Sequence, residues 1–231
     1  SRDSSDVWSE MSLFSVLGKG DLYLQSGVPP DYFSNSGQLW GTPTYRWKKH
    51  KLTKYRWWRR RISRHLKQVD LLRIDHFRAL DSYWAVDGNQ TTAKDGFWSS
   101  SPGMKMLNYF KKDIKGDLPL IAEDLGVITS EVEYLRDNFQ LPGMKILQFA
   151  FDGNCDNPYL PENIKGSNWV VYTGTHDNST TCSWWEALNY EKKEEISKRF
   201  NNKNGSPTWQ LIEMGLSTDA YLFVAPIQDL M

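Results

Sequence analysis

Three segments of the chain place a carboxylate just after a short apolar run. Asp75 follows residues 71–74, Glu123 follows residues 120–122, and Asp177 comes shortly after residues 169–172. A run rich in Val, Ile and Leu that ends in a charged residue is typical of a buried parallel strand whose carboxyl end opens into a site. Two carboxyl groups with different pKa values could cleave a glycosidic bond there, because one can protonate the departing oxygen while the other attacks the sugar carbon. The pattern therefore predicts carboxylates that converge on one site.

Longer motifs surround these carboxylates. They read Arg73-Ile74-Asp75-His76-Phe77-Arg78, Ile121-Ala122-Glu123-Asp124-Leu125-Gly126, Pro142-Gly143-Met144-Lys145 and Thr173-Gly174-Thr175-His176-Asp177-Asn178, and they are preceded by Gly27-Val28-Pro29-Pro30-Asp31-Tyr32-Phe33 and Gly37-Gln38-Leu39-Trp40-Gly41. In type and order the motifs resemble those of the 4-α-glucanotransferases of glycoside hydrolase family 77, also called amylomaltases or disproportionating enzymes, which belong to the α-amylase clan. The resemblance covers nearly the whole chain. Ala79 and Ser179 depart from the family's usual residues, but neither change removes a carboxylate.

The resemblance implies a role for each carboxylate. Asp75 is expected to be the nucleophile of a retaining mechanism, Glu123 the general acid and base, and Asp177 a third carboxylate that binds sugar hydroxyls. Arg73 stands two residues before Asp75, so on a strand both side chains leave by the same face. A cation at that position would keep Asp75 ionised and oriented.

The resemblance also implies contacts to the sugar. His176 is expected to touch the sugar at the cleaved position, and His76 either lines the cleft or packs against it. Asp152 is either a substrate contact or part of a turn before a glycine. Asn178 either shares in substrate binding or caps the next helix. Asp124, by contrast, is expected to have a structural role as a helix cap or in an ion pair.

Residues 1–45 are rich in Ser, Gly, Pro and aromatic residues and have only weak periodicity. Long irregular segments of compact domains commonly form lids or binding loops. The resemblance implies that this segment lines the catalytic cleft and that four of its side chains contact the glucan, namely Tyr32, Phe33, Gln38 and Trp40. An ordinary packed loop whose aromatic side chains fill gaps is the alternative.

Composition restricts the partners. The chain has 28 basic and 28 acidic residues, so its balanced charge gives no case for a nucleic-acid or membrane partner, and no apolar run approaches the length of a membrane span. A run of Lys and Arg between residues 46 and 67 could form a nucleic-acid patch, although a solvated helix face is the simpler interpretation. The expected partners are an α-1,4-glucan donor and a sugar acceptor.

No metal or organic cofactor is expected, because the covalent route uses side chains alone. The four histidines are scattered and form no metal-ligand motif with the two cysteines, Cys155 and Cys182. Two free thiols favour a reducing compartment, which for this family would be the cytoplasm or a plastid.

Apolar runs that alternate with helical segments predict an α/β fold. Five strands are expected, near residues 69–74, 118–122, 144–151, 169–173 and 220–225, with helices over 54–67, 130–138 and 190–200. By resemblance, the fold class is a (β/α)₈ TIM barrel of the α-amylase clan. Because family members are about twice as long, the chain is expected to be a partial catalytic barrel domain over residues 1–231 that holds roughly the later five strands.

Three functions remain open from the sequence. The favoured one is a 4-α-glucanotransferase that moves α-1,4-glucan segments between maltooligosaccharides or starch-type glucans through a covalent glycosyl-enzyme. An α-glucan hydrolase of the same clan differs only in the acceptor, which would then be water. A non-catalytic glucan-binding derivative is the third possibility, and the retained Asp75, Glu123 and Asp177 argue against it.

Overall fold

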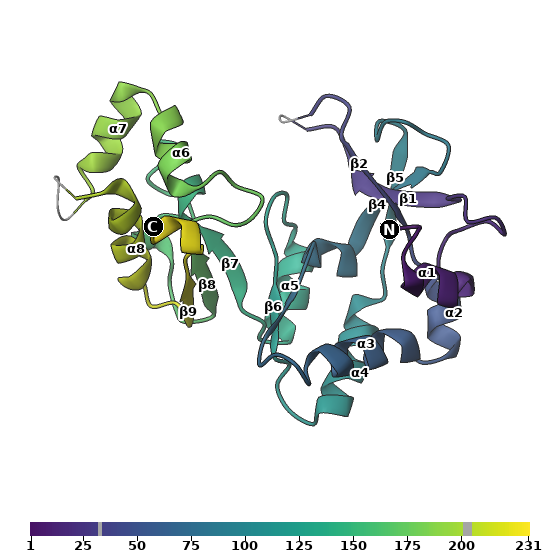
Figure 1. Ribbon diagram of the computed structural model, residues 1–231. Coiled ribbons are helices and arrows are strands. Elements are labelled where there is room, and N and C mark those ends of the chain that lie inside the picture. Colours follow the sequence, from purple (N-terminus) through teal and green to yellow (C-terminus); the bar gives the residue numbers. More distant parts are fainter. Residues whose placement is uncertain (32–33, 201–204) are drawn as a thin grey trace. The chain divides into compact units, whose positions relative to one another are not determined.

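The computed structural model describes residues 1–31, 34–200 and 205–231. These residues form two compact units, Ser1–Gln140 and Leu141–Met231, which appear from purple to teal and from green to yellow in Figure 1. Each unit is described by itself below.

The first unit contains an antiparallel sheet. Its strands, in the order β2-β1-β4-β5, are β1 (Leu24–Val28), β2 (Gln38–Pro43), β4 (Ser82–Asp87) and β5 (Gly96–Ser100). Gly27 lies so close to β2 that a Cβ there would stand 2.2 Å from the Gln38 carbonyl oxygen. The pairing of β1 with β2 lies within residues 1–45. The expectation that this segment is irregular is wrong for that reason. Both strands are short and carry glycines, so they leave little hydrophobic alternation in the sequence.

A separate parallel pair in the first unit brings two strand ends together. β3 (Leu72–Ile74) pairs with β6 (Leu120–Ala122), with Ile74 opposite Ala122. The helices of this unit are α1 (Ser5–Ser9), α2 (Trp47–Leu52), α3 (Arg56–His65), α4 (Gly103–Ile114) and α5 (Ser130–Asn138), with 3-10 turns η1 (Met11–Leu13) and η2 (Phe77–Leu80).

The basic run lies mainly on α2 and α3. Ile62 of α3 is buried, whereas Arg59 forms an ion pair with Asp113 of α4 and Arg61 with Asp6. Part of the positive charge is thus used in ion pairs within the unit, which agrees with the interpretation of the run as an outer helix face.

Helix α5 confirms the helix predicted over residues 130–138. Its N-cap is Thr129, whose side chain makes no capping hydrogen bond. The hydroxyl of Ser130 instead contacts Glu131. The helix forms without a capping box because Val132 and Leu135 are buried on one face, and tertiary packing supplies most helix stability in proteins.

The second unit is a parallel three-stranded sheet in the order β7-β8-β9, packed with helices. Its elements are β7 (Gly143–Ile146), β8 (Trp169–Tyr172), β9 (Leu222–Val224), α6 (Thr181–Ala187), α7 (Tyr190–Ser197) and α8 (Pro207–Leu216), with 3-10 turns η3 (Leu147–Phe149), η4 (Pro161–Asn163) and η5 (Ile227–Asp229) (Figure 1). Its core includes Leu147, Val171 of β8, Ile196 of α7 and Leu211 of α8.

All five strands expected from the sequence are present, and within each unit they pair in parallel. The third is shorter than expected, since β7 ends at Ile146 and residues 147–149 turn into a 3-10 helix. None of the helices within the described residues has the length and apolar character needed to cross a membrane.

Candidate active site

The parallel pairing of β3 with β6 positions two of the predicted carboxylates. Asp75 and Glu123 are the residues that follow the paired Ile74 and Ala122. The backbone contacts continue past the strands, because Glu123 N–H donates to the Ile74 carbonyl at 3.1 Å and Phe77 N–H donates to the Glu123 carbonyl at 2.9 Å. Asp75 and Glu123 therefore emerge at one edge, as the sequence predicts.

The environment of Glu123 favours a protonated carboxyl. Burial raises the pKa of Glu123 to about 7, and the nearby negative charge of Asp75 acts in the same direction. The backbone N–H of His76 donates a hydrogen bond to Glu123 Oε2, and this contact lowers the pKa, as does the charge of Arg73. A carboxyl group with a pKa near 7 can give and take a proton at neutral pH, as a general acid and base must.

Asp75 has a contrasting environment. Its side chain is 78% exposed, and Arg73 Nη2 lies 2.7 Å from Asp75 Oδ1. The ion pair shows that the two side chains meet, although Asp75 itself lies just beyond the end of β3. A guanidinium group in contact with a carboxylate fixes its orientation, which a nucleophile requires. Two neighbouring carboxyl groups thus differ in environment, the usual basis for dividing acid and nucleophile roles.

His76 connects the carboxylates to an aromatic wall. Its backbone is left-handed, with φ +47°, and this conformation is uncommon for a residue with a Cβ. The ring is half-buried and meets the Trp40 ring edge to face at 4.9 Å between centroids. Burial lowers the pKa of His76, although the charge of Asp75 opposes that effect. His76 therefore packs as a neutral ring, and its backbone N–H is the contact to Glu123 that the sequence did not suggest.

A cavity of about 460 Å³ in the first unit reaches these residues. Asp75, His76 and Trp40 line it together with a group of aromatic side chains, Tyr45, Trp47, Trp57 and Trp58. Gln38 does not line this cavity but contacts its wall, because Trp40 Nε1 donates to Gln38 Oε1 at 3.3 Å. Tyr32 and Phe33, the other predicted contacts of this segment, lie outside the described residues.

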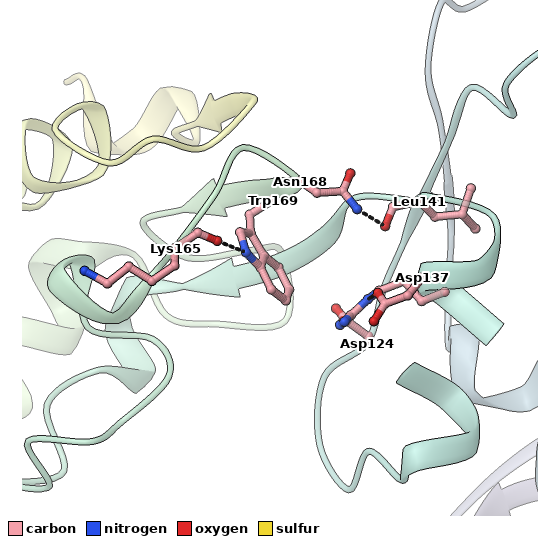
Figure 2. A network of polar contacts seen from close by, with 7 residues as sticks. Asp124, Asp137, Leu141, Lys165, Asn168 and Trp169 are labelled. Carbon is pink, nitrogen blue, oxygen red and sulfur yellow. Dashed lines mark hydrogen bonds and ion pairs between the residues drawn. The ribbon is translucent and has the colours of Figure 1, made fainter. Parts of the chain in front are cut away.

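Asp124, the residue after Glu123, forms a buried ion pair with Arg136, and Figure 2 labels Asp124 and Asp137 at this contact. Arg136 Nη1 of α5 lies 2.6 Å from Asp124 Oδ2, with side-chain exposures of 11% and 4%, and Arg136 Nε lies 2.7 Å from Asp137 Oδ1. Asp124 therefore has the ion-pair role that the sequence predicts. Its position next to Glu123 ties the end of β6 to α5.

Arg78 connects the loop after Glu123 to strand β5. Its Nη1 donates to the Val127 carbonyl at 2.8 Å, and its guanidinium lies 4.1 Å from the centroid of the Trp98 ring. The loop that begins at Glu123 is thus anchored to β5 as well as to α5.

The third predicted carboxylate belongs to the second unit. Asp177 lies in the 173–180 loop between β8 and α6, and its side chain is 74% exposed. His176 Nε2 lies 3.6 Å from Asp177 Oδ2. Asn178 Oδ1 accepts hydrogen bonds from both N–H and Oγ1 of Thr175, each at 2.9 Å, so this side chain closes the turn. Asn178 does not cap α6, because Thr180 is the N-cap and accepts from Ser183 N–H.

Asp152 forms a turn at its position in the second unit. Its Oδ1 accepts from Asn154 N–H at 2.9 Å, the next residue, Gly153, has φ +94°, and the backbone hydrogen bond lowers the pKa of the Asp152 carboxyl. This is the turn that the sequence offers as one of two interpretations. Contact with substrate stays a prediction.

The predicted site residues fall into two groups. The first unit brings Asp75 and Glu123 together with Arg73, His76, Trp40 and Gln38, and the second carries Asp177, His176, Asn178 and Asp152. Convergence of the third carboxylate with the other two stays a prediction. Sequence reasoning missed Arg136, which pairs with Asp124, and Asp229 of η5, which accepts hydrogen bonds from Thr173 and Thr181, because neither has a motif of its own. Among the described residues, no cluster of three or more His, Cys, Asp or Glu could hold a metal ion.

Comparisons with known proteins agree with the motifs. Residues 1–231 match the glycoside hydrolase family 77 profile, described as 4-alpha-glucanotransferase. A 4-alpha-glucanotransferase of Synechocystis sp. is 44% identical over 235 residues, which cover 99% of this chain and 46% of that protein. That of Thermus thermophilus is 42% identical over 237 residues (99% and 47%), and the chloroplastic/amyloplastic enzyme of Arabidopsis thaliana is 43% identical over 229 residues (99% and 39%). The chain thus spans about half or less of each relative's length.

Solved structures agree as well. The amylomaltase from Streptococcus agalactiae, determined in complex with acarbose, aligns with a TM-score of 0.92 at 38% identity, over 100% of this chain and 46% of that one. The amylomaltase from Corynebacterium glutamicum shares the fold at 17% identity, with a TM-score of 0.77 over 98% of this chain and 37% of its own. The fold is therefore of the α-amylase-clan type. The chain belongs to the 4-alpha-glucanotransferase family, glycoside hydrolase family 77.

Proposed function

We propose that the intact protein containing this chain is a 4-α-glucanotransferase that works by retaining double displacement. Membership of the family and the names of the relatives support this proposal. The observation that carries it is the pair of carboxyl groups at neighbouring strand ends, of which Glu123 has a pKa of about 7 while Asp75 is exposed and paired with Arg73. A proton donor and an anionic nucleophile side by side are what cleavage of a glycosidic bond needs.

The reaction proceeds in two displacements. Asp75 Oδ attacks the anomeric carbon while Glu123 gives its proton to the departing glycosidic oxygen, so that the shortened glucan leaves and a covalent glycosyl-enzyme forms. Glu123, now ionised, takes the proton from the hydroxyl of an acceptor sugar. That oxygen attacks the anomeric carbon and releases Asp75. Asp177 binds sugar hydroxyls and strengthens its hold in the transition state.

The remaining predicted residues bind the glucan. Trp40 is 42% exposed and offers a ring face for stacking, and its contact with His76 sets it beside the nucleophile. Rings on the acceptor side exclude water and favour transfer over hydrolysis. The other proposed substrate contacts are Arg73, Gln38, Tyr32, Phe33, Asp152, His176 and Asn178.

For the architecture we propose the (β/α)₈ barrel of the clan, with residues 1–231 as part of one catalytic barrel domain and residues 1–45 lining its cleft. The parallel pairs β3-β6 and β7-β8-β9 support this, because they supply consecutive strands in the order that a barrel uses. The partners would be an α-1,4-glucan donor and a sugar acceptor. The acarbose complex of the Streptococcus agalactiae relative supports a glucan-like ligand. The proposed location is a plastid or the cytoplasm, and the name of the Arabidopsis thaliana relative, chloroplastic/amyloplastic, supports the plastid.

Incubation of the intact protein with maltotriose tests the function. A transferase produces glucose together with longer maltooligosaccharides, while the total number of reducing ends stays constant. A steady rise in reducing ends would identify a hydrolase instead. The Asp75→Asn variant is the matched control, since it keeps the shape of the side chain but removes the nucleophile. Unchanged products from that variant would overturn the assignment of Asp75.

A further inference from the structure

Asp229 is a buried carboxylate that no motif marks. It ends η5, is 4% exposed, and accepts three hydrogen bonds. Its Oδ2 accepts from Thr173 Oγ1 at 2.6 Å and from Thr181 Oγ1 at 2.7 Å, while its Oδ1 accepts from Thr181 N–H at 3.0 Å. Both threonines are fully buried. One carboxylate thus joins two residues that are eight positions apart.

Those two residues are the ends of the segment that carries Asp177. Thr173 follows the last residue of β8, and Thr181 begins α6, so Asp229 closes the base of the 173–180 loop. Gln148 of η3 reinforces the closure, because its Nε2 donates to the Ser179 carbonyl at 3.1 Å and its backbone N–H donates to the Thr173 carbonyl at 3.2 Å. Gly174 leaves room for this side chain, since a Cβ there would lie 2.7 Å from Gln148 Nε2.

The tip of the loop is held differently. Asp177 and His176 are mostly exposed, and hydrogen bonds at the tip join residues 175–178 of the loop to one another. These contacts fix the shape of the tip, and the base of the loop then sets its position. The direction in which Asp177 points therefore depends on the Asp229 contacts.

Packing a carboxylate under the 173–180 loop carries a cost in folding free energy. Burial of an ionised group is unfavourable unless hydrogen bonds compensate, and well-packed apolar residues often stabilise a fold as much or more. The Asp229 carboxylate contributes defined directions instead. Its two oxygens orient the hydroxyls of Thr173 and Thr181 and the backbone N–H of Thr181 through short hydrogen bonds.

We propose that Asp229 is a positioning residue for sugar transfer: through Thr173 and Thr181 it fixes the 173–180 loop and so places Asp177 against the substrate. This inference rests on the proposed function. Asp229 itself touches no substrate in this account. Its removal should therefore weaken the hold of Asp177 on the transition state more than it weakens binding of the ground-state glucan.

The test uses Asp229→Asn, Thr173→Val and Thr181→Val in the intact protein, with maltotriose as donor and acceptor. A displacement of about 1 Å at a reacting group can cost about 100-fold in rate. We expect kcat to fall by about 10- to 100-fold for Asp229→Asn and by about 10-fold for each valine variant, with KM changed by less than about 3-fold. Thr173→Ser and Thr181→Ser keep the hydroxyl and should retain a kcat close to that of the unaltered protein.

Two controls separate positioning from loss of stability. Ile196→Val removes one methylene from the buried face of α7 and lowers the melting temperature without touching the loop. Asn168→Ala removes the hydrogen bond from Asn168 Nδ2 to the Leu141 carbonyl, 3.0 Å long and at the start of β8, the strand end opposite the loop (Figure 2). Both controls should keep the kcat of the unaltered protein at temperatures below their melting transitions.

The outcomes are distinct. If Asp229→Asn folds and keeps the full kcat of the unaltered protein, this inference alone is overturned. If Asp229→Asn fails to fold, full kcat in both valine variants would overturn it. So would an equal loss of kcat in Ile196→Val. Absence of transfer by the unaltered protein would overturn the proposed function and this inference with it.

Discussion

Glu123→Gln should make the protein more stable at alkaline pH while it abolishes most of the activity. The glutamine keeps an oxygen that can accept from the His76 N–H, but it carries no ionisable proton. Activity should fall by about 10²- to 10⁴-fold, the usual contribution of a general acid and base. The stability gain follows from the raised pKa and can be measured without any substrate.

The magnitude follows from linkage. Burial raises the pKa of Glu123 from 4.5 to about 7, so between these pH values the folded protein retains a proton that the unfolded chain has lost. Stability must then fall as pH rises through this window, by about 1.4 kcal/mol for each pKa unit and so by ~3.5 kcal/mol at most. Because water still reaches part of the side chain, we expect about 1–2 kcal/mol.

The assay is denaturant unfolding of both proteins at pH 4 and pH 8. Their difference in free energy of unfolding should be small at pH 4, where Glu123 is neutral, and should favour the glutamine variant by about 1–2 kcal/mol at pH 8. Glu133→Gln, at an exposed position of α5, gives the baseline for replacing a glutamate. An equal difference at both pH values would refute the reasoning about Glu123.

Three further predictions concern the same site. The kcat/KM for maltotriose should fall about tenfold per pH unit above pH ~7, since the first displacement needs protonated Glu123; a flat profile to pH 9 would contradict the acid role. Arg136→Met should lower the free energy of unfolding by about 3–5 kcal/mol, because it deprives the buried Asp124 of its arginine; a loss under 1 kcal/mol in denaturant would show that the pair contributes little. His76→Gly should be about 1 kcal/mol more stable than His76→Ala, as φ is +47° there; equal midpoints would argue against that strain.

Much of the site in the first unit could be predicted from local pattern. The strands before Asp75 and Glu123 appear as apolar runs, and parallel pairing brings their carboxyl ends to one edge. The contact between Arg73 and Asp75 follows from the alternation of side chains along a strand. These inferences succeeded because each depends on residues close together in the sequence.

What could not be predicted depends on contacts between distant segments. The pKa of Glu123 results from burial that only the folded chain creates, and the contact from the His76 backbone requires a left-handed residue that no sequence rule assigns to histidine. Strands β1 and β2 gain their stability from the sheet they join rather than from their own propensity. Asp229 reads as an ordinary acidic residue until Thr173 and Thr181 surround it.

Trapping of the covalent intermediate tests the central claim most directly. In the intact Glu123→Gln variant, α-maltosyl fluoride needs no protonation of its leaving group, so attack by Asp75 continues, while release to an acceptor lacks its base and the glycosyl-enzyme accumulates. Mass spectrometry of the digested protein should then find one maltosyl group on the peptide that contains Asp75. An unmodified protein that still consumes the fluoride, or a maltosyl group on any other residue, would contradict the roles assigned to Asp75 and Glu123.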